Sequence, residues 1–234
     1  MAAPCSRVSF NGSPDMVRRP ARNPRILLPW VGLAVGIGGL GLQFSLSMPA
    51  YAAQGKDIPG SLGTFLAFYT ILTNIVLVLV YLSVVTTWRW LEVFRHPITR
   101  GLMAANIALV MLYVYLVLRH LAVLEGQALT ADNMLHYLAP ILYLLWWVIA
   151  QPHGALKWAN LPLMLVPTLA YLVYVLARGA WVTEYPYPIL AVQKIGYGAV
   201  LLNSAYMTAA LAALMAVVIA ADHLLARFSR TVPA

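Results

Sequence analysis

The sequence predicts an all-α, polytopic membrane protein, a bundle of six transmembrane helices. Two observations carry this prediction. The 234 residues are 62% hydrophobic and only 9% charged, whereas about a quarter of the residues of a soluble domain are charged. The apolar residues also fall into six long runs, each close to the roughly 20 residues that a helix needs to cross the hydrocarbon core. Transmembrane strands would be shorter and would alternate in polarity.

The six runs divide the chain into one membrane domain with a polar tail at each end. They cover residues 26–49, 62–88, 102–118, 134–150, 161–177 and 197–220. Residues 26–226 therefore form the six-helix domain, and 227–234 a short tail. Residues 1–25 are rich in Ser, Arg, Pro and Asn with little apolar content, so we expect a disordered basic tail.

The basic residues are distributed as the positive-inside rule requires. If the N-terminus is cytoplasmic, eleven Lys and Arg lie on the inner side and four on the outer side. Three acids leave the inner side at +8, and four acids leave the outer side neutral. This asymmetry predicts that both termini are cytoplasmic, for a multi-pass protein of the cell inner (plasma) membrane. The charge indicates contact with anionic lipid rather than with nucleic acid.

The first helix contains several glycines, and Gly32 and Gly36 have the four-residue spacing that allows two helices to pack closely. Ala50-Tyr51-Ala52 is similar to a signal-peptidase site. Because the preceding apolar run is longer than the usual signal-peptide core, we expect the first helix to be retained.

The second helix carries Thr70, Thr73 and Asn74 at positions i, i+3 and i+4, which lie on one helix face. This face must point into the bundle, because a lipid-facing Asn would lack hydrogen-bond partners. Two interpretations remain open. The three groups either join helices by hydrogen bonds worth about 1 kcal/mol each, or they line a binding site.

The fourth helix carries His136 near its start, with Pro140 one turn later. Proline has no N–H, so Pro140 leaves the carbonyl of His136 without its helical donor. An ionisable side chain in a membrane segment indicates a functional site. The alternative is that His136 lies in the headgroup region and bonds a neighbouring loop.

The helix directions place Thr70, His136 and several other polar side chains in the same outer half of the membrane. At a rise of 1.5 Å per residue, Thr70 would lie about 12 Å below the outer surface. The candidate binding residues there are Thr73, Asn74, Arg119, Arg178, Tyr185 and Asn203. We therefore expect a cavity that opens toward the outer leaflet. In it, Thr70 and His136 would act as nucleophile and general base, with Asp132 or Glu184 orienting the imidazole. No cofactor or metal is predicted, since Cys5 is the only cysteine and no known metal motif is present.

Several blocks of the sequence resemble the bacterial six-span Pr6Pr membrane proteins. These blocks are Phe68-Tyr-Thr-Ile-Leu-Thr-Asn74, His136-Tyr-Leu-Ala-Pro140, Arg178-Gly179 and Tyr185-Pro-Tyr-Pro188. The resemblance covers roughly residues 27–226. The Pr6Pr group is distantly similar to the androgen-induced/FAR-17a-like family of membrane threonine hydrolases, which act on fatty-acid esters. The resemblance implies a catalytic Thr70 and His136, with Thr73 as the second candidate for the nucleophile.

Three functions follow from these patterns. The first is an intramembrane hydrolase of a lipid ester, with membrane lipid as its partner. The second is a lipid-binding or transport protein without catalysis. The third is a haem-binding electron carrier, because His120 and His136 lie on the outer side and His96 and His153 on the inner side, as axial ligand pairs would.

Overall fold

The structure, a computed structural model, describes residues 24–120 and 123–231 and contains no strand among them. Five helices are long and apolar enough to cross a membrane, and a bent pair of shorter helices makes a sixth crossing if it counts as one span. The predicted fold class, an all-α polytopic bundle, is confirmed, and the chain is a multi-pass membrane protein.

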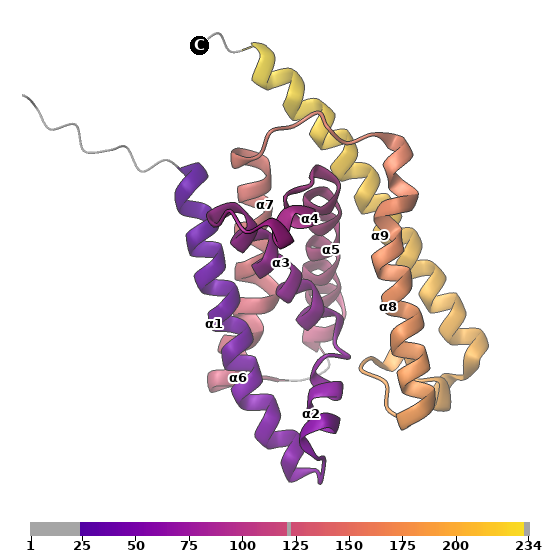
Figure 1. Cartoon of the computed structure of the whole chain (residues 1–234). Coiled ribbons are helices and arrows are strands. Elements are labelled where there is room, and N and C mark those ends of the chain that lie inside the picture. Colours follow the sequence, from indigo (N-terminus) through magenta and orange to yellow (C-terminus); the bar gives the residue numbers. More distant parts are fainter. Residues whose placement is uncertain (1–23, 121–122, 232–234) are drawn as a thin grey trace, which may run out of the picture.

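The elements follow the predicted runs closely. In chain order the α-helices are α1 (Pro24–Ala53), α2 (Ile58–Phe65), α3 (Tyr69–Val85), α4 (Glu92–Arg95), α5 (Pro97–Leu116), α6 (Gly126–Asn133), α7 (Ala139–Ala150), α8 (Leu161–Val182) and α9 (Val192–Thr231) (Figure 1). Between them lie the 3-10 turns η1 (Arg89–Leu91), η2 (Leu118–His120), η4 (Trp158–Asn160) and η5 (Pro188–Leu190), and the π-helix η3 (Met134–Leu138).

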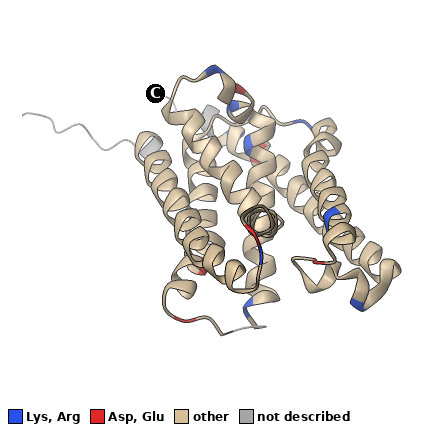
Figure 2. Cartoon of the chain, turned by 60° about the horizontal axis from the view of Figure 1, so that its bottom comes forward, with Lys and Arg blue, Asp and Glu red and all other residues tan. Residues whose placement is uncertain are grey.

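The helices pack as a bundle with a lateral hairpin. Helix α1 packs against α3 and α7, helix α5 contacts α3, α7 and α9, and α8 packs along α9. The start of α1 and the end of α9 lie at one end of the bundle (Figure 1). We call the opposite end, which carries α2, α6 and residues 183–191, the distal end. Charged residues gather at the helix ends and loops, and the lengths of the long helices carry almost none (Figure 2).

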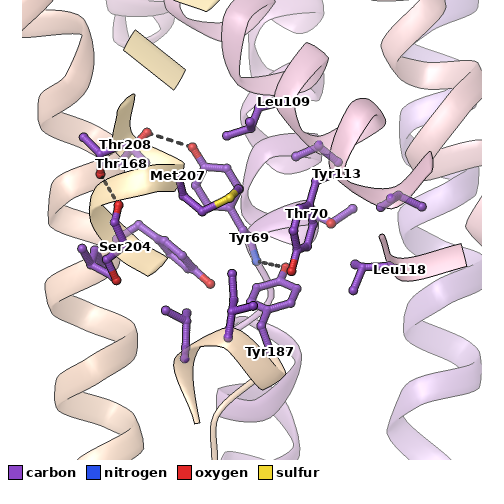
Figure 3. A pocket seen from close by; sticks show the side chains of 16 residues that line it. Tyr69, Thr70, Leu109, Tyr113, Leu118, Thr168, Tyr187, Ser204, Met207 and Thr208 are labelled. Atoms are coloured by element: carbon purple, nitrogen blue, oxygen red, sulfur yellow. Dashed lines mark hydrogen bonds between the residues drawn. The ribbon is translucent and has the colours of Figure 1, made fainter. Parts of the chain in front are cut away.

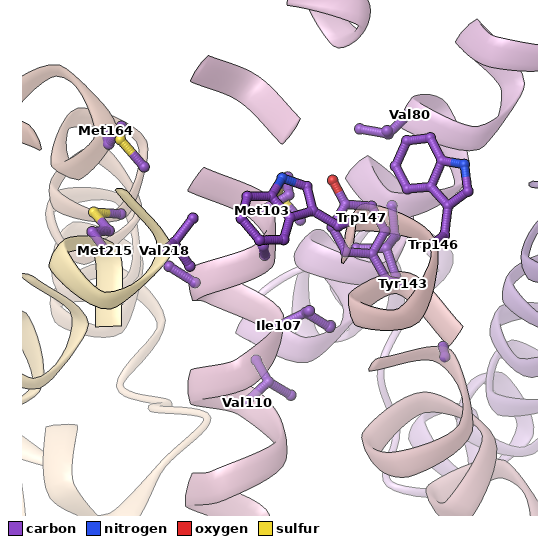
Figure 4. Packing of buried hydrophobic residues seen from close by; sticks show 14 of the residues in the cluster. Val80, Met103, Ile107, Val110, Tyr143, Trp146, Trp147, Met164, Met215 and Val218 are labelled. Carbon is purple, nitrogen blue, oxygen red and sulfur yellow. The ribbon is translucent and has the colours of Figure 1, made fainter. Parts of the chain in front are cut away.

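The main core is mostly aliphatic and extends from α1, α3 and α7 across α5 to α8 and α9, with an aromatic group contributed by α3 and α7 (Figure 4). Tyr81, Tyr143 and Trp146 are fully buried, and their ring centroids lie 5.3 to 5.7 Å apart in tilted or edge-on contacts. Aromatic pairs favour such offset geometries. A Cβ atom on Gly32 would lie 2.3 Å from the Tyr81 ring, and one on Gly36 would lie 2.7 Å from Val78. The predicted close packing at these glycines is therefore confirmed, with α3 as the neighbour.

The second predicted span is not one straight helix. The run at 62–88 contains the end of α2 and all of α3, and the two axes differ by 80° across Leu66–Phe68. The depth expected for Thr70 assumed a straight helix, so that estimate does not apply. Thr70, Thr73 and Asn74 nevertheless all belong to α3 and are all buried, as predicted for one inward face.

The ends of the domain also differ in detail from the prediction. Residues 1–23 of the expected tail lie outside the described residues, and α1 begins at Pro24. Helix α9 continues to Thr231, past the expected domain end at residue 226. Gly196 interrupts α9 near its start with a φ of 77°, in the region that favours glycine.

Candidate active site

Thr70 is the second residue of α3, directly after the bend in the broken span. The bend frees backbone groups that lipid cannot satisfy, and two tyrosines from the α8–α9 hairpin bond them. The Tyr171 hydroxyl donates to the carbonyl of Ala67 at 2.9 Å. The Tyr69 backbone N–H donates to the Tyr187 hydroxyl at 3.0 Å. Tertiary contacts therefore hold the start of α3, and with it Thr70, inside the bundle.

His136 lies within the π-helix η3, whose turn is wider than that of the α-helix α7 that follows it. The N–H of Ala139 bonds the carbonyl of Met134, five residues back. In the same register Pro140 would pair with the carbonyl of Leu135, and proline has no N–H to donate. That carbonyl instead accepts a hydrogen bond of 3.2 Å from the Asn74 amide. Asn74 thus ties α3 to the irregular backbone beside His136, and π-helical turns of this kind are frequent at functional sites.

The two predicted catalytic side chains meet. His136 Nε2 lies 3.2 Å from Thr70 Oγ1, and His136 Nδ1 lies 2.7 Å from Asp132 Oδ1. The Asp132 oxygen lies off the Nδ1–H direction, so the two groups are in close polar contact but do not meet the angle of a hydrogen bond. A proton on Nδ1 facing the carboxylate leaves Nε2 free to accept from Thr70, which is the assignment that we adopt. Both side chains are mostly buried, at 17% and 22% exposure for His136 and Asp132.

Two cavities adjoin this triad. The larger, of about 340 Å³, is lined by Asp132, His136 and the polar side chains Gln43 and Ser47 of α1. The smaller, of about 100 Å³, lies among α3, α5, α8 and α9 and is mostly apolar (Figure 3). Three residues line both: Thr70, Leu118 and Tyr187. The Thr70 hydroxyl therefore lies at the boundary between a polar space and an apolar one.

Glu184, the other candidate to orient His136, is engaged elsewhere. Its carboxylate accepts a hydrogen bond of 2.5 Å from Lys56, and the Arg178 guanidinium lies 3.7 Å away. The hydrogen bond from Lys56 lowers the pKa of the Glu184 carboxyl below its usual 4.5, although partial burial opposes the shift. Arg178 also donates to Thr64 of α2 at 3.0 Å. This cluster joins α2 to the end of α8, and Asp132 alone of the two acids reaches the imidazole.

None of the six candidate binding residues lines either cavity. The Thr73 hydroxyl donates to the carbonyls of Tyr69 and Thr70 within its own helix. Asn203 donates to the carbonyl of Ile189. The structure thus places Thr73, Asn74 and Asn203 in supporting hydrogen bonds next to the site.

The two arginines and Tyr185 lie outside the cavities as well. Arg119 is exposed, with its guanidinium 4.4 Å from the centre of the Tyr115 ring. Arg178 belongs to the cluster around Glu184. The Tyr185 ring packs against Gly179, where a Cβ atom would lie 2.0 Å from a ring carbon.

Two groups of cavity residues were not among the predicted site residues. Tyr187 belongs to the Tyr-Pro-Tyr-Pro block. The block was singled out in the sequence, but only its first tyrosine, Tyr185, was predicted as a site residue. Gln43 and Ser47 are four residues apart on α1 and are bonded to each other at 2.9 Å. This spacing on one helix face was the available signal for their shared position.

His153 and His96, the two inner-side histidines of the haem hypothesis, make other contacts. Both ring nitrogens of His153 are occupied, one by Asp222 at 3.1 Å and one by the carbonyl of Val148 at 3.1 Å. The His96 ring accepts from the N–H of Ile98 and caps α5. Within the described residues no group of three or more His, Cys, Asp or Glu is placed to hold a metal ion.

Comparison with models of known families, with curated proteins and with solved structures found no match to this chain.

Proposed function

We propose that this chain is an intramembrane hydrolase of lipid esters, with Thr70 as nucleophile and His136 as general base. The observation that carries the proposal is the 3.2 Å approach of Thr70 Oγ1 to His136 Nε2 where two cavities meet. Asp132 beside Nδ1 supports it, because a carboxylate there favours the required tautomer and stabilises the imidazolium. The resemblance to Pr6Pr proteins points to the same two residues.

The geometry suits a two-step acyl transfer. His136 Nε2 takes the hydroxyl proton of Thr70 as Oγ1 bonds to the ester carbonyl carbon, and the carbonyl electron pair moves to oxygen. Return of that pair breaks the bond to the alcohol, which leaves with the proton from His136. Water then attacks the acyl-threonine, with His136 again taking a proton. This step releases the fatty acid and restores the Thr70 hydroxyl.

The two cavities suit the two halves of such a substrate. The smaller one is lined mainly by aliphatic and aromatic side chains, such as Leu109 and Leu172, and would hold the acyl chain. The larger one presents Gln43 and Ser47 and would hold the alcohol and the attacking water. Both adjoin the distal end, which faces outward in the inner membrane if the termini are cytoplasmic.

A lipid-binding or transport protein without catalysis is the second candidate. The same cavities support it, because an apolar cavity holds an acyl chain whether or not a bond is broken. The two functions differ in one respect: only hydrolysis needs the Thr70 hydroxyl as a nucleophile.

The test is to assay purified variants for hydrolysis of umbelliferyl palmitate and for labelling by a fluorophosphonate probe. Thr70→Ala and His136→Ala should each lose about 10³-fold or more in kcat and lose labelling, because nucleophile and base act as one unit. The matched control is Thr73→Ala, one turn along the same helix, whose hydroxyl bonds only its own backbone. It should retain activity within a few-fold.

Melting temperatures of the same variants separate catalysis from folding. Full activity of Thr70→Ala with an inactive Thr73→Ala would move the nucleophile by one turn. Full activity of both variants would rule out a threonine hydrolase. An inactive wild-type protein that co-purifies with lipid would favour the binding function.

A further inference from the structure

Tyr187 lies beside Thr70, where the two cavities meet, and has no role in the acyl transfer described above. It precedes η5 in the loop between α8 and α9, flanked by Pro186 and Pro188. Its ring enters the bundle and meets Phe68 edge-on, with the centroids 5.9 Å apart. Together with Thr70 it lines both cavities. In Figure 3 its hydroxyl reaches the start of α3, beside Thr70.

The hydrogen bonding of this phenol leaves it able to donate. Its oxygen accepts the Tyr69 backbone N–H at 3.0 Å, which uses a lone pair and not the phenol hydrogen. The N-terminus of α3 carries the positive end of the helix dipole, which polarises the O–H bond further. Burial raises the pKa of Tyr187, although the hydrogen bond from the Tyr69 backbone opposes the shift. The phenol therefore keeps its proton at neutral pH.

An ester attacked by Thr70 would develop negative charge on its carbonyl oxygen within reach of this group. We propose that Tyr187 is a catalytic residue that donates a hydrogen bond to that oxyanion. This inference rests on the proposed function. The phenol proton stays on Tyr187 throughout: the hydrogen bond shortens as the carbonyl electron pair moves to oxygen and relaxes when that pair re-forms the carbonyl.

The neighbouring cations do not take this role. Lys56 and Arg178 are bound to Glu184, and neither lines a cavity. A neutral donor also suits a buried apolar site, because it stabilises the oxyanion without the desolvation penalty of a buried cation. Oxyanion donors are most effective where water is excluded and the donor is held in place. Here the two prolines and the bond from Tyr69 hold it.

The test is the kcat and KM of Tyr187→Phe with umbelliferyl palmitate. Loss of one oxyanion donor costs about 10²- to 10³-fold in kcat, and we expect KM to change much less. The matched control is Tyr143→Phe, which also removes a buried hydroxyl bonded to the backbone, at Arg100, but lies in the aromatic core. It should keep its kcat within a few-fold.

Comparison with Thr70→Ala distinguishes the two proposals. Full activity in both Thr70→Ala and Thr73→Ala would remove the proposed function itself. An inactive Thr70→Ala with a fully active Tyr187→Phe would overturn only the role of Tyr187.

A second measurement applies if Tyr187→Phe does not fold. Fluorinated tyrosines placed at position 187 keep the hydroxyl but make it a stronger donor. The kcat should then rise with each added fluorine, and a kcat that is independent of fluorination would also overturn the proposal.

Discussion

At the scale of single residues, the role of Asp132 can be separated from that of Glu184. Asp132 lies 2.7 Å from His136 Nδ1, and Asp132→Asn would remove the charge that stabilises the imidazolium. Loss of the triad aspartate costs about 10⁴-fold in serine proteases. The off-axis, partly exposed contact here should be worth less, about 10²- to 10³-fold in kcat. Steady-state hydrolysis by the purified variant measures this.

Glu184→Gln is the control for that variant, since it removes the other candidate acid but changes no group in contact with His136. It should leave kcat within a few-fold of wild type at neutral pH. Equal losses in the two variants would contradict the assignment of Asp132 as the orienting residue.

The pairing of Thr70 with His136 was predictable from the sequence, while the surrounding residues were not. Helix direction placed both side chains in the outer half of the membrane, and the resemblance of the sequence blocks pointed to the same two residues. A residue's position along a span does not determine which neighbouring helix its side chain faces. Arg119, at the end of the third predicted helix, is exposed and faces neither cavity. Tyr187 enters the site from a loop whose path depends on the packing of the α8–α9 hairpin.

At the scale of elements, the broken span was the feature that the sequence pattern hid. Leu66-Ala67-Phe68 contains neither glycine nor proline, so the apolar run reads as one helix. The bend depends on Tyr171 and Tyr187, which lie more than 100 residues later and bond the freed backbone. Tertiary contacts override local preference here, as they do for helix propensity in general.

The cluster that joins α2 to the end of α8 should make stability depend on pH. The folded-state pKa of Glu184 is depressed, so its contribution is present above the unfolded value near 4.5 and disappears as pH falls through the lower folded value. Glu184→Gln should therefore melt at a lower temperature than wild type at pH 7. The difference should begin to shrink below pH 4.5 and should vanish once the pH is below the depressed folded value, where both side chains are neutral.

Glu125→Gln is the matched control for this measurement. Glu125 lies in the distal loop before α6, and its side chain makes no capping hydrogen bond. Its substitution should leave the melting temperature unchanged at both pH values. A difference between wild type and Glu184→Gln that stays constant from pH 7 to pH 3.5 would show that the carboxylate charge is not the source of the stability.

At the scale of the whole molecule, composition and run length were sufficient to predict the fold class and the order of the spans. The fold class and the order of the spans depend only on the apolar character of whole segments, which favours their transfer from water into hydrocarbon. The packing order of the helices depends on a few close contacts, such as Tyr81 against Gly32. Spacing identified the glycines, but nothing in the sequence identified Tyr81 and Val78 as the side chains that pack against them.

The orientation of the bundle gives the last prediction. The start of α1 and the end of α9 share one end (Figure 1), and eleven of fifteen basic residues belong to the predicted inner side. Both termini should therefore be cytoplasmic. Alkaline-phosphatase fusions after Gln54, Glu125 and Glu184 should be active, and fusions after Arg95 and His153 should be inactive.

The fusion after Arg95 is the decisive one, because α2 and α3 precede it and are bent by 80°. If the bent pair crosses the membrane once, Gln54 and Arg95 lie on opposite sides and the Arg95 fusion is inactive. If the pair enters and leaves on the same side, the Arg95 fusion is active. Every later connection then changes sides, which would make the His153 fusion active and the Glu125 fusion inactive. That second pattern would contradict the six-span arrangement and the outward-facing position of Thr70 and His136.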